Sequence, residues 1–242
     1  MTLWLIGGHD PTGGAGITRD EATAARLAPA LPRRAVSTAA TWQGDGRPAR
    51  AQARPAEAFA RELEGIEHAR AIKLGLVPQS LVATLVAALA RSAAPCVMDP
   101  VLRASDGGAL GSSAGALLQL LPRVTVVTPN RDETVALLGV PASELVVASL
   151  AARGAAAWLF KDVEPGPQVC DRLVEGARVH EFRRPRRAGA DPRGTGCALA
   201  TAIACGLAQG TSLREACARA IAWLDDARTH VVAGPDGRPH LA

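Results

Sequence analysis

Short apolar segments that alternate with helical segments constrain the fold of this chain more than any other feature of its sequence. The apolar runs end at a glycine, an acid, a lysine or a proline, and a segment with helical spacing follows most of them. Strands that are buried on both faces of a parallel sheet have this continuous apolar character. The expected strands cover residues 3–6, 36–41, 71–76, 96–101, 124–129 and 156–161.

Helices are expected between these strands and again after the last one. A Ser-x-x-Glu capping box at Ser212 and Glu215 predicts where the final helix begins. The alternation of strands and helices predicts a single α/β domain over residues 1–242, with one doubly wound, mostly parallel sheet covered on both faces. The expected helices start near Thr18 and cover residues 55–66, 80–91, 130–138, 198–207 and 212–231, and a polar hairpin covers about 169–182.

Polar and glycine-rich motifs follow the strand ends repeatedly. Because the carboxyl ends of parallel strands meet at one edge of a sheet, and ligands bind beyond that edge, these motifs predict a shared ligand site. The first of them, residues 7–16, is open to a second interpretation as a tight turn without a ligand. The motifs are the loop at 7–16, Gln43, Asp99, residues 130–133 and Lys161.

A second glycine motif, Gly194-Thr195-Gly196-Cys197, precedes an Ala-rich apolar run. A glycine turn that opens a helix leaves backbone N–H groups unpaired at the positive end of the helix dipole, which predicts an anion site. Thiol pKa values fall at helix N-termini, so Cys197 is predicted to be a thiolate able to accept a proton. The alternative is a small buried cysteine without a chemical role.

The cysteines and the N-terminus bear on the compartment. Five cysteines form no CxxC pair, the first apolar run is too short for a signal peptide, and no 18-residue apolar stretch occurs. We therefore expect reduced thiols in a cytoplasmic protein without a membrane span. The net charge is +4, with one arginine cluster at residues 183–187. That cluster is compatible with a nucleic-acid patch or with a loop that meets a phosphorylated small molecule.

Read in order, these motifs resemble the ribokinase superfamily and, within it, the hydroxymethylpyrimidine/phosphomethylpyrimidine kinases. Most sugar kinases of the superfamily have Asp where this chain has Cys197, whereas the pyrimidine kinases typically have Cys. The resemblance implies a ribokinase-like three-layer α/β/α fold with a mostly parallel central sheet. It rests on residues 8–17, Lys73-Leu74-Gly75, Asp99-Pro100-Val101, Thr128-Pro129-Asn130 with Glu133, and Gly194 to Cys197.

The resemblance implies ATP-dependent phosphorylation of 4-amino-5-hydroxymethyl-2-methylpyrimidine and then of its monophosphate, in thiamin biosynthesis. It implies ATP and Mg²⁺, with K⁺ as a further candidate cation, a homodimer, a small-molecule substrate, and neither a nucleic-acid nor a membrane partner. Two alternatives stay open. One is a pyridoxal or pyridoxine kinase, and the other is a degenerate kinase fold that binds a pyrimidine without catalysis.

At the acceptor end of the site, the resemblance assigns substrate binding to Gly8, Asp20, Gln43, Leu76 and Val101. Asp20 and Gln43 would hydrogen-bond the aminopyrimidine, whose donor–acceptor edge suits a carboxylate and an amide. Leu76 and Val101 would line its apolar faces. The alternative for Gln43 is a turn side chain in water, and for Asp20 it is an acid near the start of a helix.

At the phosphate end, the resemblance assigns metal binding, nucleotide binding and phosphoryl transfer. Asp99 and Glu133 suit Mg²⁺, which takes one or two carboxylates besides phosphate oxygens and waters, although Glu133 also suits a capping acid. Asn130, Lys161 and Thr195 are the expected nucleotide contacts. The backbone of Gly194, Thr195 and Gly196 would form the anion hole, with Cys197 as the base.

Two positions depart from the pattern of the family. Asp162-Val163-Glu164-Pro165 follows Lys161, where the family usually has Gly-Gly-His, and Arg193 precedes Gly194, where His is common. Arg193 is conjectured to contact phosphate in place of that histidine. Lys73 receives no role from the sequence.

Overall fold

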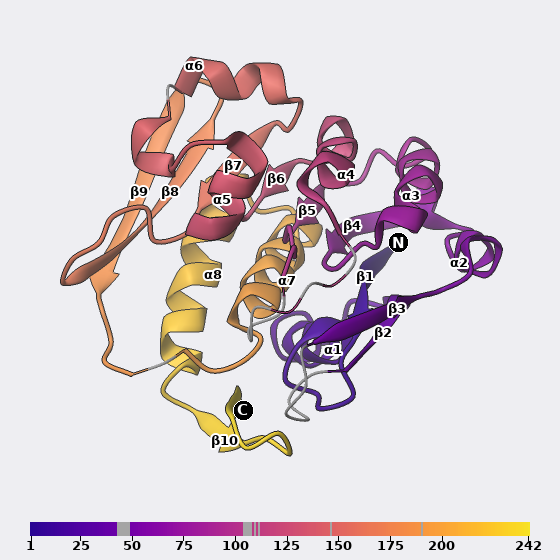
Figure 1. The fold of residues 1–242 in the computed structure, drawn as a ribbon, viewed down its shortest axis with the longest axis horizontal. Helices are drawn as coiled ribbons and strands as arrows, with labels where there is room; N and C mark the ends of the chain where they lie inside the picture. The colour runs from indigo at the N-terminus through magenta and orange to yellow at the C-terminus, as the bar shows by residue number, and fades with distance from the viewer. Residues whose placement is uncertain (43–48, 104–107, 109, 111, 146, 190) are drawn as a thin grey trace.

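The computed structural model describes residues 1–42, 49–103, 108, 110, 112–145, 147–189 and 191–242. Helices flank a central sheet on both sides, and the C-terminal hairpin lies below it in the view of Figure 1. The prediction of an α/β fold with a mostly parallel sheet is confirmed.

The sheet has nine strands in the order β3-β2-β1-β4-β5-β6-β7-β8-β9. The strands from β2 to β7 pair in parallel, whereas β3 pairs antiparallel with β2 at one edge, and β8 and β9 extend the other edge antiparallel. The strands are β1 (Thr2–His9), β2 (Arg33–Trp42), β3 (Arg50–Ala53), β4 (Ala69–Leu74), β5 (Cys96–Met98), β6 (Val126–Val127), β7 (Ala157–Phe160), β8 (Gln168–Glu175) and β9 (Arg178–Pro185).

Two apolar layers form because successive strand residues point to opposite faces. In β1, Leu3 and Leu5 join the core under one set of helices, while Trp4 and Ile6 join the core on the other side. The first layer contains α1 (Gly16–Leu27), α7 (Thr195–Ala208) and α8 (Leu213–Ala227). The second contains α2 (Ala56–Glu62), α3 (Val82–Leu89), α4 (Ala114–Leu118), α5 (Arg131–Leu138) and the short α6 (Val147–Leu150).

The predicted strand and helix positions are confirmed for the parallel core, but several bounds differ. The strand expected over 96–101 ends at Met98, because Pro100 has no N–H and the N–H of Val101 turns back to the carbonyl of Asp99 at 2.9 Å. The last helix ends at Ala227 rather than continuing to residue 231. β-Branched Val231 and Val232 instead belong to β10 (Val231–Ala233).

A C-terminal hairpin follows that was not predicted. β10 pairs antiparallel with β11 (Pro239–Leu241) as a separate two-stranded sheet. Its turn is closed by a 2.8 Å hydrogen bond from the N–H of Gly234 to the carbonyl of Arg238. Among the described residues, the hairpin pairs with no strand of the main sheet, so other contacts must hold it in place.

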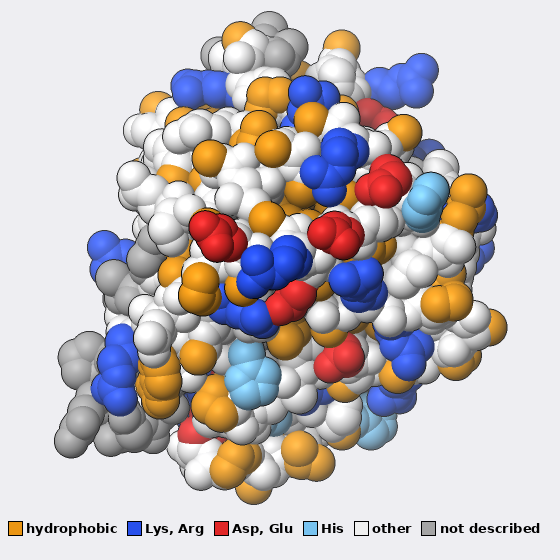
Figure 2. Space-filling view, turned by 90° about the vertical axis from the view of Figure 1, so that its right-hand side faces the viewer, with side chains coloured by type: hydrophobic (Ala, Val, Ile, Leu, Met, Phe, Trp, Pro, Cys, Tyr) orange, Lys and Arg blue, Asp and Glu red, His pale blue; other side chains and the backbone are white. Residues whose placement is uncertain are grey.

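The outer surface mixes charges of both signs. On the side that carries α2 and α3, Figure 2 shows Lys and Arg side chains interspersed with Asp and Glu. None of the helices in the described ranges is long and apolar enough to cross a bilayer.

Candidate active site

A large cavity of about 1240 Å³ opens at the carboxyl edge of the parallel strands. Its wall includes the loop after β1, the segments that follow β5, β6 and β7, and the N-terminus of α7. The structure thus brings together motifs that are far apart in the sequence. Of the predicted site residues, those that line the cavity are Gly8, Leu76, Asp99, Val101, Asn130, Glu133, Lys161, Gly194, Thr195, Gly196 and Cys197.

The anion-binding turn lies at the start of α7. Gly194 is the N-cap residue with φ +81°, a left-handed conformation that favours glycine. A Cβ at this position would lie 2.1 Å from the carbonyl oxygen of Gly14, so the turn packs directly against the first glycine loop. The first helical hydrogen bond runs from the N–H of Ala198 to the carbonyl of Gly194 at 2.8 Å. The N–H groups of Thr195, Gly196 and Cys197 therefore precede the helical ladder and are available to an anion.

A lysine and two carboxylates lie beside this turn. Lys161 Nζ is 3.2 Å from Asp99 Oδ1 and 3.9 Å from Glu133 Oε2. Burial alone would lower the pKa of Lys161, but Asp99 and Glu133 raise it above its usual value, so the side chain is an ammonium. A Cβ on Gly196 would lie 3.2 Å from Asp99 Oδ2, which places the turn against that carboxylate.

These residues fit a magnesium ion that is only partly held by protein. Asp99 and Glu133 offer hard oxygen donors that both lie within 4 Å of Lys161 Nζ, while the described residues contain no cluster of three or more metal-ligating side chains. Mg²⁺ in nucleotide sites characteristically uses one or two carboxylates and completes its shell with phosphate oxygens and water. The donor set fits that pattern.

Glu133 also caps α5. Asn130 Oδ1 accepts from the N–H of Glu133 at 2.9 Å, and the N–H of Asn130 donates to Glu133 Oε2 at 2.8 Å. This is the reciprocal capping box that was the alternative for Glu133. Burial raises the pKa of Glu133 to about 7, with Asp99 and Asp132 acting in the same direction and Lys161 opposing them. The capping role and a role toward a metal use the same fixed carboxylate.

Cys197 lies where the sequence predicted it, but its ionisation differs. Burial raises the pKa of the thiol to about 12, although the Lys73 ammonium and the Gly16 N–H act in the opposite direction. Desolvation therefore outweighs the helix N-terminus at this position. The prediction of a thiolate is wrong for this structure, in which the side chain is a neutral thiol on the wall of the cavity.

Asp20 does not face the cavity. Its carboxylate is fully buried, with Oδ2 accepting from Lys73 Nζ at 2.6 Å and Oδ1 accepting from the Thr201 hydroxyl at 2.8 Å. Both oxygens are thus used inside the protein, and the prediction that Asp20 hydrogen-bonds the substrate ring is wrong for this structure. Lys73, which the sequence left without a role, is its partner and borders the cavity.

One part of the cavity wall is apolar. Leu76 and Leu110 are buried in a cluster with Ala39 and Ala49, and Val101 packs against it. A flat ring of modest size matches such a wall. Gln43, the expected reader of the ring edge, lies outside the described residues.

Sequence reasoning missed the partners of Arg193. The side chain is buried, and its guanidinium pairs with Asp10 at 2.8 Å and with Asp236 of the C-terminal hairpin. Arg193 also lines the cavity, so the conjecture that it contacts phosphate stays a prediction, for a guanidinium that is already held by two carboxylates. A buried arginine needs buried acids, and that requirement was the only signal in the sequence for these partners.

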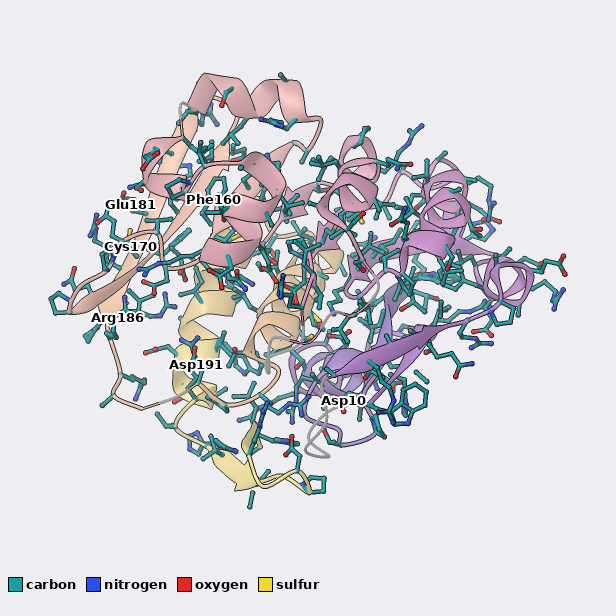
Figure 3. All side chains as sticks on the ribbon, in the orientation of Figure 1. Asp10, Phe160, Cys170, Glu181, Arg186 and Asp191 are labelled. Atoms are coloured by element: carbon teal, nitrogen blue, oxygen red, sulfur yellow. The ribbon has the colours of Figure 1, made fainter. Side chains whose placement is uncertain are left out.

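The arginine cluster at 183–187 lies on β9 and directly after it. Arg184, Arg186 and Arg187 border the cavity, and Figure 3 shows Arg186 where β9 ends, away from the turn that joins β8 to β9. Each arginine pairs with an acid of this chain: Arg183 with Glu181, Arg184 with Asp171, Arg186 with Asp162, and Arg187 with Asp225. Each of these guanidinium groups therefore has a carboxylate partner within the chain.

Together these features define a class of protein. A three-layer α/β fold carries a helix N-terminus for an anion, a carboxylate pair for a hard cation and an ammonium, all in one cavity with an apolar wall. This combination is that of a small-molecule kinase of the ribokinase-like fold.

The comparisons with known proteins identify the family. The profile of the phosphomethylpyrimidine kinase family matches residues 10–237. A hydroxymethylpyrimidine/phosphomethylpyrimidine kinase of Streptomyces coelicolor is 35% identical over 220 residues, covering 86% of this chain and 81% of the relative. One from Rhizobium meliloti is 31% identical, covering 90% of this chain and 87% of the relative. The chain belongs to the phosphomethylpyrimidine kinase family.

Solved structures support the same fold. The pyridoxal kinase of Staphylococcus aureus in complex with ADP superposes with a TM-score of 0.86 at 23% identity, covering 100% of this chain and 92% of that one. The phosphomethylpyrimidine kinase of Clostridium difficile gives a TM-score of 0.76 at 23% identity, covering 93% and 98%. The prediction of a ribokinase-like fold is thereby confirmed.

Proposed function

We propose that this protein transfers the γ-phosphoryl group of ATP to the hydroxymethyl oxygen of 4-amino-5-hydroxymethyl-2-methylpyrimidine, and then a second phosphoryl group to the resulting monophosphate. One observation carries the proposal: in a chain of this family, Cys197 and the anion-binding turn line the same cavity as Asp99 and Lys161. The donor and acceptor halves of such a reaction therefore have a common site.

In the proposed reaction, the hydroxyl oxygen forms a bond to the γ-phosphorus while the bond between that phosphorus and the β–γ bridging oxygen breaks. ADP leaves, and the hydroxyl proton is released. In a loose transition state the bond from the acceptor oxygen to phosphorus has barely formed, so the hydroxyl keeps its proton until late. Catalysis then depends on positioning the reactants and on stabilising the charge of the phosphate oxygens. The backbone N–H groups of Thr195, Gly196 and Cys197 and the Lys161 ammonium suit that task.

Asp99 and Glu133 would hold Mg²⁺, which when bound neutralises phosphate charge. Their distances to Lys161, 3.2 Å and 3.9 Å, support a compact arrangement of one ammonium and two carboxylates around the phosphates. Asn130 contributes by fixing the Glu133 carboxylate through the capping box. A cytoplasmic location and a homodimer form part of the same proposal, with the five free cysteines supporting a reducing compartment.

Cys197 is proposed to lie beside the acceptor hydroxyl. Because its pKa is raised, the side chain is a protonated thiol that can hydrogen-bond to the hydroxyl, and it acts as the base only in its thiolate form, after it has lost its own proton. While the thiol is protonated, the proton lost by the hydroxyl late in the reaction passes to solvent. The apolar wall of Leu76 and Val101 would bind the faces of the ring, and Gln43 would read its polar edge.

A product assay tests the proposal. Purified protein is incubated with ATP, Mg²⁺ and the hydroxymethylpyrimidine, and mono- and diphosphates are resolved by mass spectrometry, with pyridoxal as a parallel acceptor. We expect both pyrimidine products to appear, and faster turnover of the pyrimidine than of pyridoxal. Turnover of pyridoxal alone would establish the pyridoxal kinase alternative, which the fold also accommodates. Binding of the pyrimidine by calorimetry without either product would establish a non-catalytic protein.

A further inference from the structure

Three segments that are distant in the sequence meet at one buried arginine next to the anion-binding turn. Arg193 immediately precedes Gly194, and its side chain is only 4% exposed. One terminal nitrogen donates to Asp10 Oδ2 at 2.8 Å and the other to Asp236 Oδ2. Figure 3 shows Asp10 on the side of the molecule where the C-terminal hairpin lies.

Each of the two carboxylates also organises its own segment. The second oxygen of Asp10 accepts from the N–H and the hydroxyl of Thr12 at 3.0 Å and 2.9 Å, which shapes the first glycine loop. The second oxygen of Asp236 contacts His240 Nε2 at 2.8 Å and accepts from the N–H of Arg238 at 3.3 Å, which shapes the hairpin. The guanidinium fork thus joins two segments that are already ordered.

Backbone contacts fix the hairpin in the same place. The N–H of Arg193 donates to the carbonyl of Pro239 at 2.9 Å, and Arg19 donates to the carbonyl of Leu241 at 2.6 Å. The His240 ring packs so closely on the glycine loop that a Cβ at Gly14 would lie 2.6 Å from it. The hairpin therefore contacts both the loop at the acceptor side and the residue that begins the anion turn.

We propose that Arg193 is a positioning residue, and that the Asp10–Arg193–Asp236 clamp holds the glycine loop and the anion-binding turn at the separation that phosphoryl transfer requires. The C-terminal hairpin is the anchor of this clamp. The inference rests on the proposed function, because it assigns to Arg193 an effect on the transfer step. The substitution Arg193→Lys keeps the positive charge, but it replaces the planar guanidinium, which donates to both carboxylates at once, by a single ammonium group.

Two clamp variants and two matched controls test the inference. Arg193→Lys and Asp236→Asn alter the clamp, while Arg54→Lys and Glu62→Gln make the same chemical changes in an arginine–carboxylate pair beside α2, away from the cavity. All proteins are assayed well below their own Tm, so that the folded enzyme is compared. We expect kcat to fall about tenfold or more in both clamp variants with KM changing less, because misplacement of reacting groups acts on the transfer step. The controls keep wild-type kcat.

A purely structural role predicts a different result: Tm falls, but kcat per folded molecule stays within twofold of wild type. That result in both clamp variants would overturn the inference. Affinity for the nucleotide analogue AMP-PCP with Mg²⁺, measured by calorimetry, separates this inference from the proposed function. A wild-type protein that phosphorylates neither acceptor would overturn the proposed function. If AMP-PCP then still binds more weakly to the clamp variants than to wild type, the positioning role of the clamp is kept. Unchanged AMP-PCP affinity and unchanged kcat in the variants overturn the clamp alone.

Discussion

The buried Lys73–Asp20 ion pair makes a sharp prediction about stability. Both side chains are fully buried, and Lys73 Nζ lies 2.6 Å from Asp20 Oδ2. Burial would lower the pKa of Lys73, but the Asp20 carboxylate, with further help from Asp99, raises it above the usual value, so the pair is ionic. Lys73→Met removes the cation and leaves a carboxylate without its partner in the interior.

Breaking a buried ion pair from one side costs about 3–5 kcal/mol, because the remaining charge loses its compensation. For a chain of this size, each kcal/mol corresponds to about 2–4 °C in Tm, so Lys73→Met is expected to lower Tm by roughly 6–20 °C. Asp20→Asn keeps the shape and an acceptor for the Thr201 hydroxyl but leaves the lysine unpaired, and a loss of similar size is expected. The double variant is expected to lose less than the sum of the two single variants.

Urea unfolding at pH 7 with linear extrapolation measures these differences. Arg219→Ala is the control, because it removes an exposed pair with Glu215 whose side chains are 69% and 49% exposed. Such a pair contributes at most about 1 kcal/mol. If Lys73→Met unfolds within 1 kcal/mol of wild type, or if the single losses add in the double variant, the pair is not the buried ionic contact described above.

Two further predictions concern the start of α7. Gly194→Ala is expected to reduce kcat about a hundredfold, because the added Cβ would lie 2.1 Å from the Gly14 carbonyl oxygen and displace the turn. Gly210→Ala is the control: Gly210 has a similar φ of +86° but open space around it, so this variant is expected to keep wild-type kcat. Equal kcat in both variants would contradict the prediction. Because the pKa of Cys197 is raised to about 12, only a fraction of roughly 10⁻⁴ of the thiol is ionised at pH 8. Labelling of Cys197 by iodoacetamide, measured by peptide mass spectrometry, is therefore expected to be slow at pH 8 and to become about tenfold faster per pH unit up to pH 10. A labelling midpoint below pH 9 would show that the thiolate forms readily.

The parallel core and the location of the site were predictable because they depend on local patterns. Apolar runs identify buried strands, and polar residues at their ends identify the functional edge, so Asp99 and Lys161 were found without knowledge of the tertiary structure. The partner of Lys73 was not predictable in the same way. It lies 53 residues away on α1, and only the packing of α1 against the sheet directs the carboxylate inward. A lysine inside an apolar strand nevertheless signals that a buried acid must exist.

The prediction that Cys197 is a thiolate was wrong for a related reason. A helix N-terminus stabilises a thiolate by an amount that falls off within one turn, whereas desolvation depends on every neighbouring atom. The sequence identifies the helix and the glycines before Cys197, but it does not show how closely the surrounding residues exclude water. Tertiary packing therefore determined the ionisation state.

The loop after Lys161 holds an unusual backbone conformation. Asp162 has φ +50°, the only positive φ among the described non-glycine residues. Asp tolerates this conformation better than most residues, at a cost of order 1 kcal/mol. Arg186 offsets the cost by donating to both carboxylate oxygens at 2.9 Å and 2.7 Å, and Arg131 adds a contact at 3.3 Å. Arg186, which directly follows β9, thus fastens the loop after Lys161 from within the chain at the wall of the cavity.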